Sequence, residues 1–239
     1  MPDINIRGEL WDNDNADILR WWGWRDLTAP GDIAAALAEA GDEPVTVLVN
    51  SPGGDMAVGG EIRSMLRRHA PGATAIIQGH CASAATLAIS ACRAIRCEPG
   101  ALLCYHNPLG GAEGDYHAME GAAEGLRNAR DCILEMYEAR GGLKATREQL
   151  IELMDRDVWI TPTQALSYGL IDEIIPASEG AEDEDGDSAA FVAAAGCRYR
   201  LTAEMRAQYR AHIAAEREAA AREDEAARAR ARLRTLAEY

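Results

Sequence analysis

The chain has 239 residues, 48% of them hydrophobic, and this length suits one sizeable domain with a smaller appendage, because single cores stop growing at about 250 to 300 residues. No run of about 18 apolar residues occurs and no basic-then-apolar segment opens the chain, so we expect a soluble cytoplasmic protein that is not exported and has no membrane partner. The formal net charge of −15 argues against nucleic acid as the main partner, because phosphate binding requires clustered cations.

Strand and helix patterns alternate from the start of the chain. The alternation of residues 3–8 fits a half-buried strand that ends in a glycine. Residues 32–40 predict a short helix, and the nearly continuous apolar run of residues 45–49 predicts a parallel strand covered on both faces. A group of tryptophans between the first strand and this helix indicates core or subunit-interface packing, or else a recognition surface: Trp11, Trp21, Trp22 and Trp24.

A glycine-rich turn follows the second strand. The segment Asn50-Ser51-Pro52-Gly53-Gly54 combines a proline, which has no N–H donor, with two glycines that permit backbone angles and close approaches closed to other residues. Such a turn either lays its N–H groups against a substrate carbonyl or starts the helix predicted over residues 56–69.

The chain is organised around the stretch from residue 74 to residue 90. Residues 74–77 predict a buried strand ended by Gly79, and the small and apolar residues after Ser83 predict a helix packed closely on several sides. At the first turn of that helix the Ser83 hydroxyl would lie beside free N–H groups and the positive end of the helix dipole, where an oxyanion is stabilised. The alternative is a turn serine that caps a core helix.

The second half of the chain continues the alternation. Residues 101–105 predict a strand that His106 follows, and residues 115–140 predict a long amphipathic helix. Two helices that open with capping boxes and a last strand complete the domain: 146–154, 161–168 and 170–175. Strands that alternate with helices indicate an α/β architecture with right-handed crossovers.

Three residues suited to nucleophilic catalysis stand at the edges of predicted elements. Ser83, His106 and Asp157 supply, in this order, a nucleophile, a base and an orienting carboxylate, and the backbone N–H groups of Gly54 and Ala84 could supply two oxyanion donors. Together they form the arrangement used in acyl transfer. A histidine at a strand end is also common as a hydrogen-bonded structural residue.

These residues resemble motifs of the Clp-type serine peptidases, a family with the crotonase-like fold. The resemblance covers roughly residues 4–176 and is carried by four segments in order: Asn50-Ser51-Pro52-Gly53-Gly54, Gly79-His80-Cys81-Ala82-Ser83, His106-Asn107-Pro108-Leu109-Gly110-Gly111, and Arg156-Asp157 with Ala165-Leu166-Ser167-Tyr168-Gly169-Leu170-Ile171-Asp172. It implies a spiral of ββα units with a long handle helix, a ring-shaped homo-oligomer and protein or peptide substrates.

The resemblance also implies a role for each site residue. Ser83 would be the nucleophile, His106 the base and Asp157 the third member of the triad. The amides of Gly54 and Ala84 would form the oxyanion hole. The segment that holds the substrate strand would be Ser51, Pro52 and Gly53.

Departures from the family pattern indicate a branch. Cys81-Ala82 precedes the serine and Ala84-Ala85 follows it, where housekeeping members usually have Ala-Ala and Met-Gly, and Trp159 follows the aspartate. These variations resemble the phage and prophage branch, whose members mature capsids. The resemblance therefore implies a head-maturation protease acting on capsid or scaffold proteins in a bacterial cytoplasm or a phage prohead, with an ATP-dependent Clp proteolytic subunit served by an unfoldase as the alternative.

Composition divides the chain into three parts. Residues 1–177 form the expected protease domain, residues 178–200 an acidic linker exposed to self-cleavage, and residues 201–239 a helical tail rich in Ala, Arg and Glu. The tail carries a narrow apolar stripe at steps of four: Leu201, Met205, Tyr209 and Ile213. It would be a docking helix for a capsid or scaffold partner, or a solvated tail.

Two other functions stay open, and we expect no cofactor. A Ser-Lys peptidase would have to use Lys144, the single lysine, and a crotonase-fold acyl-CoA enzyme or inactive scaffold would keep the glycine loop without the triad. The cysteines contain no C-x-x-C pair and are interpreted as buried, reduced thiols, not as a zinc site or disulfide framework: Cys81, Cys92, Cys97, Cys104, Cys132 and Cys197.

Overall fold

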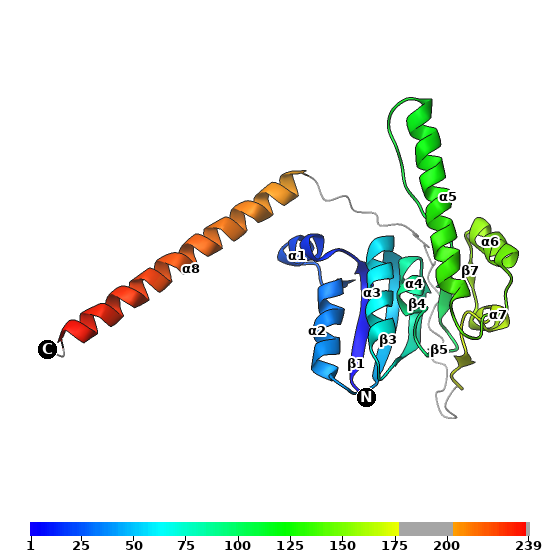
Figure 1. The fold of residues 1–239 in the computed structure, drawn as a ribbon, viewed down its shortest axis with the longest axis horizontal. Helices are drawn as coiled ribbons and strands as arrows, with labels where there is room; N and C mark the ends of the chain where they lie inside the picture. The colour runs from blue at the N-terminus through cyan, green and yellow to red at the C-terminus, as the bar shows by residue number, and fades with distance from the viewer. Residues whose placement is uncertain (177–202, 238–239) are drawn as a thin grey trace, which may run out of the picture. The chain divides into compact units, whose positions relative to one another are not determined.

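A largely parallel sheet forms the centre of the structure, a computed structural model that describes residues 1–176 and 203–237 (Figure 1). Within these residues six strands follow the order β2-β1-β3-β4-β5-β8, and each pairs with its neighbours in parallel. Their bounds are β1 Asp3–Leu10, β2 Leu27–Thr28, β3 Val45–Gly54, β4 Ala73–Ala82, β5 Ala94–Cys97 and β8 Glu173–Ile174. Parallel neighbours require crossover connections, and helices supply them, as the alternating pattern predicts.

The sheet branches at β4. Residues 74–77 of β4 pair with β5, whereas residues 80–82 pair with β6 (Leu102–Cys104). β6 also pairs, in the antiparallel sense, with β7 (Trp159–Ile160). The branch therefore brings together three segments that lie far apart in the sequence.

Helices flank the sheet and connect its strands (Figure 1). Their bounds are α1 Asn13–Trp21, α2 Pro30–Ala40, α3 Met56–Arg68, α4 Ala84–Ile89, α5 Tyr116–Glu138, α6 Arg147–Arg156 and α7 Pro162–Tyr168. A further helix after the last strand, α8, spans Ala203–Ala237. Every residue of α4 is buried, which confirms the close packing predicted for it. The capping boxes predicted at the starts of α6 and α7 are also present.

Two strands extend further than the sequence predicts. β3 continues through Gly54 and β4 through Ala82, so the predicted turn is part of a strand and Gly79 does not end β4. A register shift follows Val49, and inside it the Asn50 Oδ1 accepts the His80 N–H at 3.2 Å. Pairing with neighbouring strands here overrides the weak local propensities of glycine and proline.

Local patterns also misjudged the shortest elements. The helix α1 and the strands β2, β5 and β7 are not predicted, because such short segments depend on the partners they find in the fold. The apolar run of residues 45–49 predicted a strand covered on both faces. The structure differs, because side chains along β3 alternate between buried and half-buried, so one face is covered more fully than the other.

The described residues separate into two units. The first contains Met1–Ala16 and the described residues from Arg25 to 176, and the second contains Asp17–Trp24 and α8. Within the second unit the Trp21 ring centroid lies 6.1 Å from that of Tyr209 and 4.9 Å from that of His212. Trp21 and Trp22 are 40% and 45% exposed, so these two are not core residues, and subunit-interface packing and a recognition surface stay as the predictions for them. The predicted linker, residues 178–200, lies outside the described residues.

Four cysteines are free and buried as predicted, namely Cys81, Cys92, Cys97 and Cys104. The prediction is wrong for Cys132, which is exposed on α5, and Cys197 lies outside the described residues. Within residues 1–176 and 203–237, no helix combines the length and apolar character that a bilayer crossing requires.

Candidate active site

The turn between β4 and α4 holds Ser83 in a strained backbone conformation. Its φ of 55° is one of two positive values among the described non-glycine residues, and the other belongs to Asp157. Such a conformation costs a residue with a Cβ roughly 1–3 kcal/mol and is found preferentially at functional sites. The Ser83 side chain makes no capping hydrogen bond to α4, so the alternative of a capping serine is wrong.

Hydrogen bonds on both sides fix this turn. The Ser83 N–H donates to the Cys104 carbonyl at 3.0 Å, and the Ser83 carbonyl accepts from the Thr86 hydroxyl at 2.6 Å. Because that hydroxyl has a single proton, the Tyr137 hydroxyl must donate to Thr86 Oγ1, at 2.6 Å. Burial raises the pKa of Tyr137 well above its usual value, which keeps this donor protonated.

Strand β3 approaches the turn closely at Gly53. A Cβ on Gly53 would lie 2.5 Å from the Ala82 carbonyl oxygen and 2.6 Å from the Ser83 Cβ, and the φ of Gly53 is +93°. The hydroxyl of Ser51, which is fully buried, donates to the Gly8 carbonyl at 2.6 Å and accepts from the Gly53 N–H at 3.1 Å. Ser51 thus shapes the strand, and its side chain faces the protein interior.

The two predicted oxyanion donors lie on the segments that meet at this turn. Ala84 is the first residue of α4, where an amide N–H has no acceptor within its own helix. Gly54 pairs with Leu10 of β1, and the Leu10 carbonyl accepts from the following Asp55 N–H at 3.0 Å.

The imidazole of His106, two residues beyond β6, is hydrogen-bonded within its own segment. Its Nδ1 donates to the Asn107 carbonyl at 2.7 Å, since a carbonyl can only accept. In the neutral ring Nε2 then carries the lone pair, and this atom is buried without a hydrogen-bond partner among the described residues. This tautomer leaves Nε2 able to accept a proton from a serine hydroxyl.

Asp157 caps the end of α6 in the left-handed conformation, and Val158 separates it from β7. Its Oδ1 lies 4.0 Å from the Cys104 Sγ, whose thiol donates to it. Within residues 1–176 neither ring nitrogen of His106 is hydrogen-bonded to Asp157 or to Ser83. The structure thus brings the three predicted residues to the ends of elements around the branch of the sheet but does not join them in one hydrogen-bonded relay.

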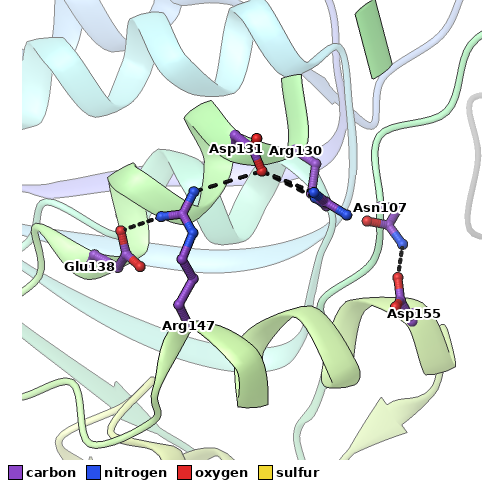
Figure 2. A network of polar contacts seen from close by, with 6 residues as sticks. All are labelled: Asn107, Arg130, Asp131, Glu138, Arg147 and Asp155. Carbon is purple, nitrogen blue, oxygen red and sulfur yellow. Dashed lines mark hydrogen bonds and ion pairs between the residues drawn. The ribbon is translucent and has the colours of Figure 1, made fainter. Parts of the chain in front are cut away.

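A polar network links α5, α6 and the segment after the histidine (Figure 2). Arg147 of α6 pairs with Glu138 at 2.7 Å and with Asp131 at 3.7 Å, both on α5. The Asn107 amide donates to Asp155 Oδ1 at 2.8 Å. This bond connects Asn107, the residue after His106, to α6, the helix that ends at Asp157.

Sequence reasoning missed the residues that hold the site together. Thr86 and Tyr137 support the Ser83 turn, and Cys104 contacts both Ser83 and Asp157. The one available signal was position, because Cys104 lies near the end of the strand predicted over residues 101–105, which leads to the histidine.

Comparisons with known proteins agree with this architecture. Residues 32–178 match the model of the Clp protease family. The ATP-dependent Clp protease proteolytic subunit 2 of Gluconobacter oxydans is 32% identical over 181 residues, which are 73% of this chain and 79% of that protein. The ATP-dependent Clp protease proteolytic subunit 3 of Rhizobium etli is 34% identical over 143 residues, which are 59% of this chain and 72% of that protein. A ClpP1 mutant from Listeria monocytogenes has a TM-score of 0.59 at 23% identity and covers 75% of this chain and 94% of its own, which confirms the predicted crotonase-like α/β fold.

The close approach at Gly53 can be tested by adding one methyl group. We expect Gly53→Ala to lower the free energy of unfolding by about 2 kcal/mol or more, because the Cβ would overlap the Ala82 carbonyl and φ is positive. Gly100→Ala is the matched control, since a Cβ there meets nothing within 4 Å, and it should stay within about 0.5 kcal/mol of wild type. Chemical denaturation measures both, and equal stability of the two variants would contradict the contact.

Proposed function

The chain belongs to the Clp protease family of serine peptidases, and we propose that Ser83 is its nucleophile, His106 its general base and Asp157 the carboxylate that orients the imidazole. The Ser83 hydroxyl attacks the scissile carbonyl while His106 Nε2 takes its proton and later returns it to the leaving amine. The N–H groups of Gly54 and Ala84 stabilise the oxyanion that forms.

The observation that carries this proposal is the hydrogen bond between His106 Nδ1 and the Asn107 carbonyl. A base for serine needs a lone pair on Nε2, and the hydrogen bond from Nδ1 to the Asn107 carbonyl produces it. That Nε2 is buried and has no partner among the described residues, so no competing donor occupies it. The strained turn of Ser83 supports the same assignment, since its hydroxyl is not used to cap α4.

In the productive arrangement the imidazole exchanges one acceptor for another. His106 Nδ1 now donates to a neutral carbonyl, and during catalysis it donates to the Asp157 carboxylate instead. A hydrogen bond to an ionised acceptor is roughly twice as strong as a neutral one, so the exchange is favoured once the ring becomes positively charged. The bond from Asn107 to Asp155 keeps the histidine segment beside α6 throughout.

A Ser-Lys mechanism with Lys144 as the base is less well supported than this triad. The Lys144 Nζ donates to the Leu166 carbonyl at 3.1 Å, so its ammonium group is engaged outside the Ser83 turn. The non-proteolytic alternatives, an acyl-CoA enzyme or an inactive scaffold, do not require a reactive serine.

Replacing the nucleophile tests the assignment. We expect Ser83→Ala to abolish peptide cleavage, a loss of roughly 10⁴ to 10⁶ in turnover, while the unfolding transition stays close to that of wild type. A fluorophosphonate probe mapped by mass spectrometry should label Ser83 in the wild-type protein only. Unchanged cleavage by the variant would refute the mechanism, and an unlabelled wild type would favour the non-proteolytic alternatives.

We also propose that the protein is a ring-shaped homo-oligomer built through α5. In the single chain the buried residues of this helix lie near its end: Ile133, Leu134 and Tyr137. Near its start Met119 is 46% exposed and Tyr116 is 65% exposed. Figure 1 shows this half projecting beyond the sheet, so a second copy of the chain is the partner we assign to it.

Light scattering after size-exclusion chromatography checks the assembly. We expect a mass several times that of one chain at micromolar concentration, and a shift toward monomer in Met119→Asp, which places a charge in the proposed contact. Glu120→Asp is the control, because it puts aspartate in the same helical turn without adding charge. A wild-type monomer at all micromolar concentrations would exclude the oligomer.

As substrates we propose head proteins of a phage or prophage, capsid or scaffold, processed in the bacterial cytoplasm or prohead. The family match ends at residue 178, whereas α8 lies beyond it, and a protease carried into an assembling shell needs such a tether. The second candidate is an ATP-dependent Clp proteolytic subunit, which is what the named relatives are called.

The wild type and Ser83→Ala also distinguish the two substrate classes. When capsid or scaffold proteins are co-expressed with the enzyme, we expect them to be shortened by the wild type and left intact by Ser83→Ala. Intact masses of the enzyme itself should show loss of the tail near residues 178–200 in the wild type only. Untouched shell proteins, together with degradation that requires an ATPase unfoldase, would assign the protein to the second class.

A further inference from the structure

Cys104 stands at the junction of the segments that carry the three proposed catalytic residues. It ends β6, where the strand register pairs it with Ala82 of β4 and with Trp159 of β7. Of its two neighbouring strands, β4 leads into Ser83 and β7 begins shortly after Asp157.

The backbone and the side chain of Cys104 contact different parts of the site. Its carbonyl accepts the Ser83 N–H at 3.0 Å, which fixes the nucleophile turn. Its Sγ lies 4.0 Å from Asp157 Oδ1, and within residues 1–176 no other donor is hydrogen-bonded to that carboxylate. Among the described residues the thiol is thus the donor that lies against this carboxylate, at the long end of the range for a hydrogen bond from sulfur.

The thiol is suited to donate and poorly suited to react. Cys104 is buried, and this burial, together with the charge of Asp157, raises its pKa to about 11. It therefore remains protonated at neutral pH, whereas a nucleophilic or metal-binding cysteine needs the thiolate.

We propose that Cys104 is a positioning residue whose thiol holds Oδ1 of Asp157, so that Oδ2 is presented to the His106 imidazole during catalysis. This inference rests on the proposed triad. A carboxylate without this donor samples other rotations, and the imidazolium that forms in the transition state loses part of its stabilisation. The Cys104 side chain touches no reacting atom, so its thiol acts through Asp157, whereas its carbonyl holds the Ser83 turn.

Three substitutions separate this role from simple packing. Cys104→Ala removes the donor, Cys104→Val fills the space without a donor, and Cys104→Ser restores a donor. Cys97→Ala is the matched control, since Cys97 is also fully buried but its thiol donates to the Glu98 carbonyl at 3.5 Å. Thermal unfolding identifies any variant that fails to fold.

The kinetic arm follows kcat/KM for a peptide substrate as a function of pH. We expect about a tenfold loss in the alanine and valine variants, recovery to within about threefold in Cys104→Ser, and wild-type activity in Cys97→Ala. The acidic limb of the profile should move to lower pH in the two variants without a donor, because a less stabilised imidazolium loses its proton more readily. An unmoved limb, or a serine variant no better than alanine, would overturn the proposal.

Infrared spectroscopy tests the contact between the Cys104 thiol and Asp157 independently of catalysis. The infrared S–H stretching band of Cys104 is isolated as the difference between the wild type and Cys104→Ala. We expect this band to rise in frequency in Asp157→Asn, because the charged acceptor is lost, and a band at the same frequency would show that the thiol does not hold the carboxylate. If the wild type cleaves nothing and Ser83 is not labelled, the triad itself fails, and the infrared result still decides the contact.

Discussion

The hydrogen bond from the Ser83 N–H to the Cys104 carbonyl joins two strands of the sheet at the point where it branches. β4 leaves its pairing with β5 and pairs with β6 over its last residues, so this bond continues the ladder one residue past the end of β4. It holds the serine in a backbone conformation that an isolated turn would avoid. The other features of the site depend on this turn being closed.

Close approach of backbone segments is the second requirement. Gly53 lies against the turn itself, and Gly59 of α3 lies against Ala84, where a Cβ on Gly59 would come within 2.5 Å of the Ala84 carbonyl oxygen. The glycines and the small residues of α4 therefore act together, because each permits a contact that a larger side chain would prevent. This explains why a stretch with little apolar volume forms the most completely buried helix of the first unit.

Support for the turn also comes from the long helix. Tyr137 near the end of α5 donates to Thr86, which in turn donates to the Ser83 carbonyl. On the same helix, Asp131 before Tyr137 and Glu138 directly after it pair with Arg147 at the start of α6, the helix that ends at Asp157. The helix that presents exposed apolar side chains at one end is thus connected, at its other end, to the segments of both Ser83 and Asp157.

The sequence by itself determined the features that arise from local chemistry. The alternation of elements, the capping boxes at Thr146 and Thr161, the placement of Ser83 at a helix start and the order of the candidate residues all follow from residue type and spacing. Only the tertiary structure decided how far β3 and β4 extend, because ladder hydrogen bonds to neighbours outweigh local propensity. It also decided that His106 donates to its own segment and that Cys104 contacts Asp157, since both contacts depend on side-chain directions and on pairing between residues distant in the chain.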